Sequence, residues 1–188
     1  MKHSNMRKER VVIIVAGITR SGLSLTMQML AAGGYPCAGT FPDYEPFPIG
    51  QIPWSGIDGM AVKLVDAHRQ LPPVGPKYRI IRLNRNKTEQ ARSINKWMAA
   101  FFHLSANVSV LLGSLRRDYE TIDAWASEHD TLVLEFEGII KSPRESAERI
   151  VEWLGCPLDI DEMVKAVKPR GVECYQGLLK LELISGMP

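Results

Sequence analysis

The sequence predicts an α/β fold in which a three-layer open parallel β-sheet is flanked by helices. Short apolar segments rich in β-branched residues alternate with segments of helical periodicity, the pattern of strands joined by crossover helices. The first apolar run, residues 11–16, has no polar alternation, as expected for a parallel strand covered on both faces. It leads into a glycine-containing loop and then a helical segment, so we expect it to be a central strand.

Local signals mark the ends of the other elements. A glycine pair at 33–34 ends the first helix, and Asn86 can cap the second. Ser142 is followed by Pro143 and, three residues on, by Glu145, which predicts a capping box at the start of a late helix. We expect strands at 11–16, 60–65, 78–83 and 131–136, and helices at 23–32, from Asn86 onward, at 108–126 and at 142–154.

The chain of 188 residues is long enough for one domain with a sizeable core and too short for two with separate roles. We expect a flexible tail at 1–10 and a single domain at 11–188 with a proline-rich loop at 35–59. Long loops inside compact domains usually carry function, with a simple covering loop as the alternative. The residues of this loop that could line a pocket are Asp43, Tyr44, Glu45 and Trp54.

Composition limits the class of partner. A formal net charge of +2 gives no sign of a nucleic-acid or membrane surface, so an anion site must be local. Three widely spaced cysteines argue against a disulfide framework and a zinc site, which favours a reducing compartment and a cytoplasmic location. The first apolar run is too short to span a membrane. The oligomeric state stays open, a homo-oligomer included.

The segment Gly17-Ile-Thr-Arg-Ser-Gly22-Leu23-Ser24 has the spacing of a phosphate-binding Walker A loop, but Leu23 replaces its lysine. Two glycines and the start of the next helix can still bind a phosphate, which predicts a P-loop NTPase-like fold. Arg20 supplies a cation at a different place, so an anion smaller than a triphosphate fits better. The alternative is a tight strand-to-helix turn without a ligand.

A second pair of polar residues follows the third strand. Arg85 lies just past its end, and Ser93 lies about two helical turns further on. Strand ends on the carboxyl side face the ligand crevice of an open α/β sheet, so both side chains could reach the same anion as the first loop. The alternative is that Arg85 pairs with a surface carboxylate and Ser93 is solvated.

These segments resemble the sulfotransferase superfamily. Residues 14–30 are similar to the family's 5′-phosphosulfate loop, and 78–86 with 91–93 to its 3′-phosphate site. Residues 131–140, leading into a capped helix, resemble its closing strand and helix. The resemblance implies an enzyme with 3′-phosphoadenylyl sulfate as donor, adenosine 3′,5′-bisphosphate as product and no metal requirement. The sulfuryl group would pass to a hydroxyl or amine of a small-molecule or carbohydrate-like acceptor.

The resemblance also implies roles for individual residues. Arg20 would stabilise the leaving oxygen, Lys63 would lie close to the donor, and His68 would be the base, with Glu45 or Asp43 as rival bases. The predicted phosphosulfate contacts are Gly17, Thr19, Arg20, Ser21, Gly22, Leu23 and Ser24, and the predicted 3′-phosphate contacts are Arg85, Ser93 and Arg170. Trp54 or Tyr175 could stack on adenine.

Two positions depart from the family pattern. Thr19 and Leu23 stand where the family commonly has proline and threonine. The missing hydroxyl at Leu23 removes one phosphate contact, worth on the order of 1 kcal/mol. Two alternative functions therefore stay open: a divergent P-loop kinase or NTPase, and a non-catalytic nucleotide-binding protein of the same fold.

Overall fold

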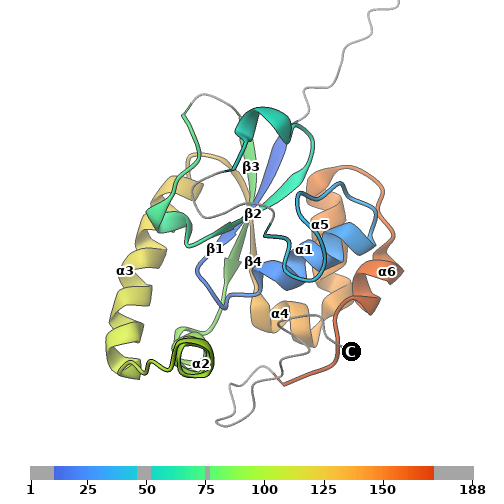
Figure 1. The fold of residues 1–188 in the computed structure, drawn as a ribbon. Helices are drawn as coiled ribbons and strands as arrows, with labels where there is room; N and C mark the ends of the chain where they lie inside the picture. Colours follow the sequence, from blue (N-terminus) through green and yellow to red (C-terminus); the bar gives the residue numbers. More distant parts are fainter. Residues whose placement is uncertain (1–10, 46–51, 75–76, 172–188) are drawn as a thin grey trace, which may run out of the picture.

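The computed structural model describes residues 11–45, 52–74 and 77–171. The expected tail at 1–10, part of the proline-rich loop and Tyr175 lie outside these residues. In the described part, the strands form one sheet with helices on both sides (Figure 1). The predicted α/β fold with an open parallel sheet is confirmed.

The sheet has the strand order β2-β1-β3-β4, and all its pairings are parallel. Every residue of β1 is buried, as its continuous apolar run predicts for a central strand. In the register, Gly17 at the end of β1 lies beside Val65 at the end of β2. The carboxyl ends of neighbouring strands therefore meet at one edge. The strands are β1 (Val12–Gly17), β2 (Ala61–Val65), β3 (Tyr78–Asn84) and β4 (Asp130–Glu135).

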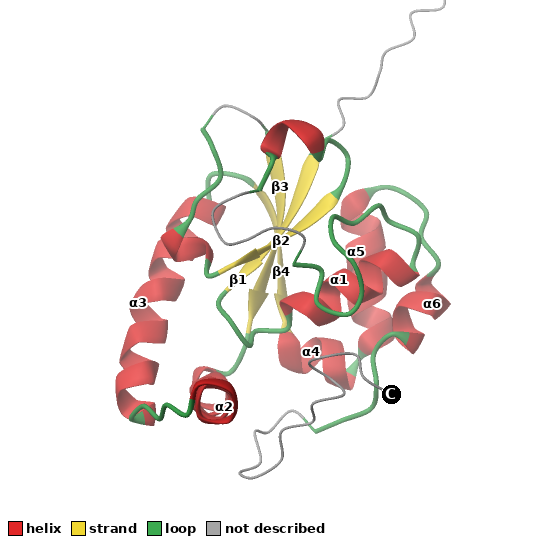
Figure 2. Ribbon diagram, in the orientation of Figure 1, coloured by secondary structure: helices red, strands yellow, loops and turns green. Residues whose placement is uncertain are grey.

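Each face of the sheet is covered by its own group of helices (Figure 2). Along β1, Ile13 and Val15 enter the core shared with α1, α5 and α6, whereas Ile14 and Ala16 enter the core shared with α2 and α3. This alternation produces the three layers. The helices are α1 (Leu23–Ala32), α2 (Lys87–Phe102), α3 (Val108–Ala126), α4 (Phe136–Lys141), α5 (Pro143–Leu154) and α6 (Ile160–Lys165).

Two short 3-10 helices, η1 (Trp54–Gly56) and η2 (Ala67–Arg69), lie in the connections around β2. The ring of Trp54 packs against Tyr78, with ring centroids 5.5 Å apart. Because Tyr78 begins β3, Trp54 lies at the amino end of the strands, opposite the edge that carries the glycine loop. Trp54 therefore serves packing at that end of the sheet, whereas Tyr44 of the proline-rich loop is buried in the core with α1.

The structure corrects one expected boundary and one expected cap. The fourth strand ends at Glu135, one residue early, because Phe136 begins α4 and buries its side chain together with Ile139, three residues on. Ser142 precedes α5 as predicted, but its side chain makes no capping hydrogen bond. Its N–H instead donates to Gly138 O, since the same residue also ends α4. The expected cap at Asn86 is confirmed, because its side chain accepts from two N–H groups of the first turn of α2.

Candidate functional site

The loop between β1 and α1 has a backbone that few sequences can adopt. Arg20 has φ 66° and Gly22 has φ 104°, both in the left-handed region. A Cβ on Gly22 would lie 2.8 Å from Cδ2 of Phe136, so the ring occupies the space of a side chain. Gly22 is therefore required both for its conformation and for the close approach of Phe136.

Gly17→Ala is expected to lower the free energy of unfolding by about 1–3 kcal/mol. The new Cβ would lie 2.6 Å from Ser21 Oγ and 3.3 Å from Leu83 O, and Ser21 is fully buried. Gly113→Ala in α3 is the control, because the nearest atom lies 4.0 Å away. There we expect a gain of roughly 0.5–1 kcal/mol. Urea unfolding measures the free energy of unfolding of both variants. A value for Gly17→Ala equal to that of the wild type would contradict the close packing at Gly17.

The loop meets the two residues that follow β3. Arg20 Nε donates to Ser93 Oγ at 3.2 Å, and Arg85 Nη1 donates to Arg20 O at 2.8 Å. Ser93 is only 5% exposed and Arg85 8% exposed, so the alternative of a solvated Ser93 is wrong. The structure thus brings together the two segments that the sequence places at the same edge of the sheet.

Arg170 lies over the same aromatic ring as Arg85. Its guanidinium lies over the Phe136 ring at 5.6 Å, and that of Arg85 lies over the ring at 4.3 Å. Burial lowers the pKa of Arg170, and the charge of Arg85 lowers it further. Two cations held close together in a partly buried place favour an anion between them.

Two buried polar atoms test whether these residues fit a phosphorylated donor. Ser21 Oγ and Arg170 Nε are buried and have no hydrogen-bond partner among the residues that the structure describes. Buried donors without partners are uncommon, and phosphate oxygens would satisfy them. The residues of the loop and of the second site therefore fit a ligand with two phosphate groups.

A lysine reaches the loop from the neighbouring strand. Lys63 Nζ donates to Ser24 Oγ at 3.1 Å and to Glu45 Oε1 at 2.6 Å, and its side chain is 2% exposed. Burial lowers the pKa of Lys63, whereas the carboxylates of Glu45 and Asp43 oppose the shift. Lys63 thus brings a cation to the first turn of α1, where Leu23 offers none.

Two of the predicted phosphosulfate contacts, Leu23 and Thr19, have a group that is not available to a ligand. Leu23 buries its side chain in the core beside α1, which leaves only its backbone for a ligand. The N–H of Thr19 donates to Asp66 Oδ1 at 2.8 Å, so this group is already engaged.

His68 faces a different neighbour. Its Nε2 accepts from Arg69 Nε at 3.1 Å and lies 3.8 Å from Asp118 Oδ1 on α3. No contact recorded among the described residues joins His68 to the phosphate loop. Its role as base stays a prediction that these contacts do not support.

Sequence reasoning missed two residues that contact the loop. Asp66 binds Thr19 N, and Gln90 Nε2 donates to Thr19 O at 3.0 Å and to Ile18 O at 3.4 Å. Asp66 directly follows β2 at the carboxyl edge, and Gln90 lies three residues before Ser93 on α2. The sequence could have indicated both residues. Asp66 is a polar residue at the edge of the sheet where ligands bind, and Gln90 is a polar residue on the same helix face as the predicted contact Ser93.

Two further properties concern metals and membranes. In residues 11–45, 52–74 and 77–171, no group of three His, Cys, Asp or Glu side chains is placed to hold a metal ion. No helix in that same part of the chain is long and apolar enough to cross a membrane.

Residues 74–177, more than half of the chain, match the family model described as the sulfotransferase domain. The chain therefore belongs to the sulfotransferase domain family. A search of curated proteins gave no match. The matched segment includes Arg85, Ser93 and Arg170, whereas the phosphate loop precedes it and is joined to it by the contact between Arg20 and Ser93.

Proposed function

We propose that this protein is a sulfotransferase that uses 3′-phosphoadenylyl sulfate and delivers the sulfuryl group to a hydroxyl or amine. The observation that carries the proposal is the contact between the two phosphate motifs, in which Arg20 Nε meets Ser93 Oγ at 3.2 Å. One ligand with two phosphate groups can then touch both motifs. When bound, the donor supplies the sulfuryl group that is transferred. A small-molecule or carbohydrate-like acceptor and a cytoplasmic location belong to the same proposal.

The proposed binding residues divide into two groups. Arg85, Ser93 and Arg170 hold the 3′-phosphate, because two guanidinium groups beside a buried hydroxyl provide charge and hydrogen bonds together. The backbone of the loop, with Ser21 and Ser24, holds the phosphosulfate end at the start of α1. The second group consists of Gly17, Thr19, Arg20, Ser21, Gly22, Leu23 and Ser24.

Cations at the loop stabilise the charge that develops on the leaving oxygen. Arg20 belongs to the loop and contacts Ser93 on α2, whereas Lys63 reaches the loop from β2 and contacts Ser24 at the start of α1. Preorganised charges of this kind act most strongly where water is excluded, and the Lys63 side chain is nearly fully buried.

We propose that Glu45 is the base, which removes the proton from the hydroxyl or amine that receives the sulfuryl group. Its side chain is 57% exposed, yet Oε1 lies 2.6 Å from the buried Lys63 Nζ, so the carboxylate belongs to the site and faces solvent. An acceptor arriving from solvent can therefore meet it. Asp43 is a close neighbour, because its Oδ1 accepts from Glu45 N at 3.2 Å. His68, held between Arg69 and Asp118, is the weaker candidate.

Titration calorimetry with adenosine 3′,5′-bisphosphate, ADP and magnesium-ATP tests the donor. We expect the wild type to prefer the bisphosphate, and Arg85→Ala to bind it about 10- to 150-fold more weakly, because a hydrogen bond to a charged group contributes about 1.5–3 kcal/mol. The loss of ADP affinity should be smaller, because ADP has no 3′-phosphate and Arg85 meets the loop through its bond to Arg20 O. Arg92→Ala is the matched control, since Arg92 lies on α2, the helix that follows Arg85, and is half exposed and paired with Glu89.

The result can also favour another function. Magnesium-ATP binding as tight as that of the bisphosphate would contradict the sulfotransferase proposal and support kinase or NTPase chemistry. Bisphosphate binding without sulfuryl transfer to any acceptor would support a non-catalytic nucleotide-binding protein.

A further inference from the structure

Side chains from outside the phosphate loop form hydrogen bonds with its backbone. Its residue Arg20 has φ 66°, a costly backbone conformation for a residue other than glycine. Such conformations persist only where the surroundings fix them. The contacts that could do so run to the backbone of residues 18–20.

One contact comes from the end of β2. Asp66 Oδ1 accepts from Thr19 N at 2.8 Å, and Asp66 itself has φ 51°. Two left-handed residues thus lie at the carboxyl ends of adjacent strands, and the hydrogen bond connects their loops. At position 19 the N–H is available for this bond because the residue is threonine, whereas proline has none.

Two further contacts come from α2, beside the hydrogen bond that Arg85 Nη1 donates to Arg20 O. Gln90 is fully buried, and its Nε2 donates to Thr19 O at 3.0 Å and Ile18 O at 3.4 Å. Gln90 and Ser93 are three residues apart and therefore share a helix face. The same turn of α2 thus carries a residue of the proposed 3′-phosphate site and a residue that holds the loop.

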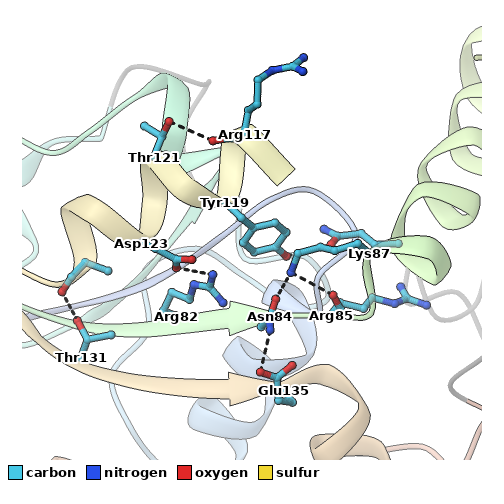
Figure 3. A network of polar contacts seen from close by, with 12 residues as sticks. Arg82, Asn84, Arg85, Lys87, Arg117, Tyr119, Thr121, Asp123, Thr131 and Glu135 are labelled. Carbon is cyan, nitrogen blue, oxygen red and sulfur yellow. Dashed lines mark hydrogen bonds and ion pairs between the residues drawn. The ribbon is translucent and has the colours of Figure 1, made fainter. Parts of the chain in front are cut away.

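Gln90 is in turn oriented by Tyr119. The Tyr119 hydroxyl donates to Gln90 Oε1 at 2.9 Å, which leaves the amide nitrogen to face the loop. Figure 3 shows the Tyr119 ring beside Lys87 and Arg82, whose cationic groups lie 3.5 Å and 4.7 Å from its centroid. Burial raises the pKa of Tyr119 to about 12, so its hydroxyl remains a donor at neutral pH.

We infer that Asp66 and Gln90, the latter oriented by Tyr119, are positioning residues that fix the phosphate loop in its donor-binding conformation. They act through the backbone of Ile18 and Thr19. The inference deepens the proposed function and rests on it for the identity of the ligand, but the hydrogen bonds themselves can be tested without any ligand.

The first test compares two buried tyrosines. Tyr119→Phe removes the hydroxyl that orients Gln90, and Tyr78→Phe removes one that donates to Pro73 O at 3.2 Å, at the opposite end of the sheet. Each loses one hydrogen bond and keeps its ring. We expect Tyr119→Phe to bind adenosine 3′,5′-bisphosphate about 2- to 12-fold more weakly and Tyr78→Phe to bind it as the wild type does. Equal effects of the two variants would overturn the role of Tyr119.

The second test follows the amide of Thr19 by hydrogen exchange in the free protein. Asp66→Ala is expected to speed exchange of the Thr19 amide by about 10-fold or more and to weaken bisphosphate binding. Asp66→Asn keeps an acceptor oxygen, so most of the amide protection and most of the bisphosphate affinity should remain. Unchanged exchange in Asp66→Ala would overturn the inference. If the wild type does not bind the bisphosphate, the proposed function fails, and the exchange result still decides whether Asp66 holds the loop.

Discussion

Arg20→Ala is expected to lower the rate of sulfuryl transfer by about 10²- to 10³-fold, the usual effect of removing one group that stabilises charge in the transition state. Arg20 is the residue of the loop whose side chain reaches the second phosphate motif, through Ser93 Oγ at 3.2 Å. Steady-state kinetics with 3′-phosphoadenylyl sulfate and an acceptor found by screening measures the loss.

Arg20→Lys is the matched control for this variant. It keeps the charge, and both residues carry a Cβ in the same left-handed conformation, so backbone strain is the same. We expect Arg20→Lys to retain most of the activity. Equal losses in the two variants would show that the geometry of the guanidinium, rather than its charge, is what the reaction needs.

Glu45→Gln is expected to lower the rate by about 10²- to 10⁴-fold, the range for loss of a general base. The amide keeps the size of the side chain and an oxygen that can accept from Lys63 Nζ, but it cannot take a proton. Donor binding should therefore stay near the wild-type value, and the loss should fall on kcat.

His68→Gln separates the two candidate bases. If Glu45 is the base, His68→Gln changes the rate little, because the contacts of His68 run to Arg69 and Asp118. A large loss of kcat in His68→Gln with an active Glu45→Gln would reverse the assignment.

The sequence was most informative where the signal is local. The continuous apolar run of β1 predicts a strand buried on both faces, and the cap at Asn86 predicts the start of α2; both are confirmed. The switch from β4 to α4 at Phe136 was missed, because an apolar residue after an apolar strand fits either element until its neighbours at helical spacing are considered.

The site could be predicted only in part. The spacing of Arg85 and Ser93 follows from one strand and the helix after it, which local patterns can reveal. The bonds of Asp66 and Gln90 to Thr19 join residues 47 and 71 positions apart, and only the strand order of the sheet brings them together. The direction of His68, toward α3, likewise depends on how η2 packs.

Phe136 touches both halves of the proposed donor site. Its ring fills the space beside Gly22 and lies under the guanidinium groups of Arg85 and Arg170. An apolar side chain that contacts no phosphate in the proposed scheme thus fixes the spacing between the two phosphate sites. A smaller side chain at position 136 would therefore loosen the packing under both phosphate sites at once, whereas position 22 admits no side chain, because the ring fills the space and φ is 104°.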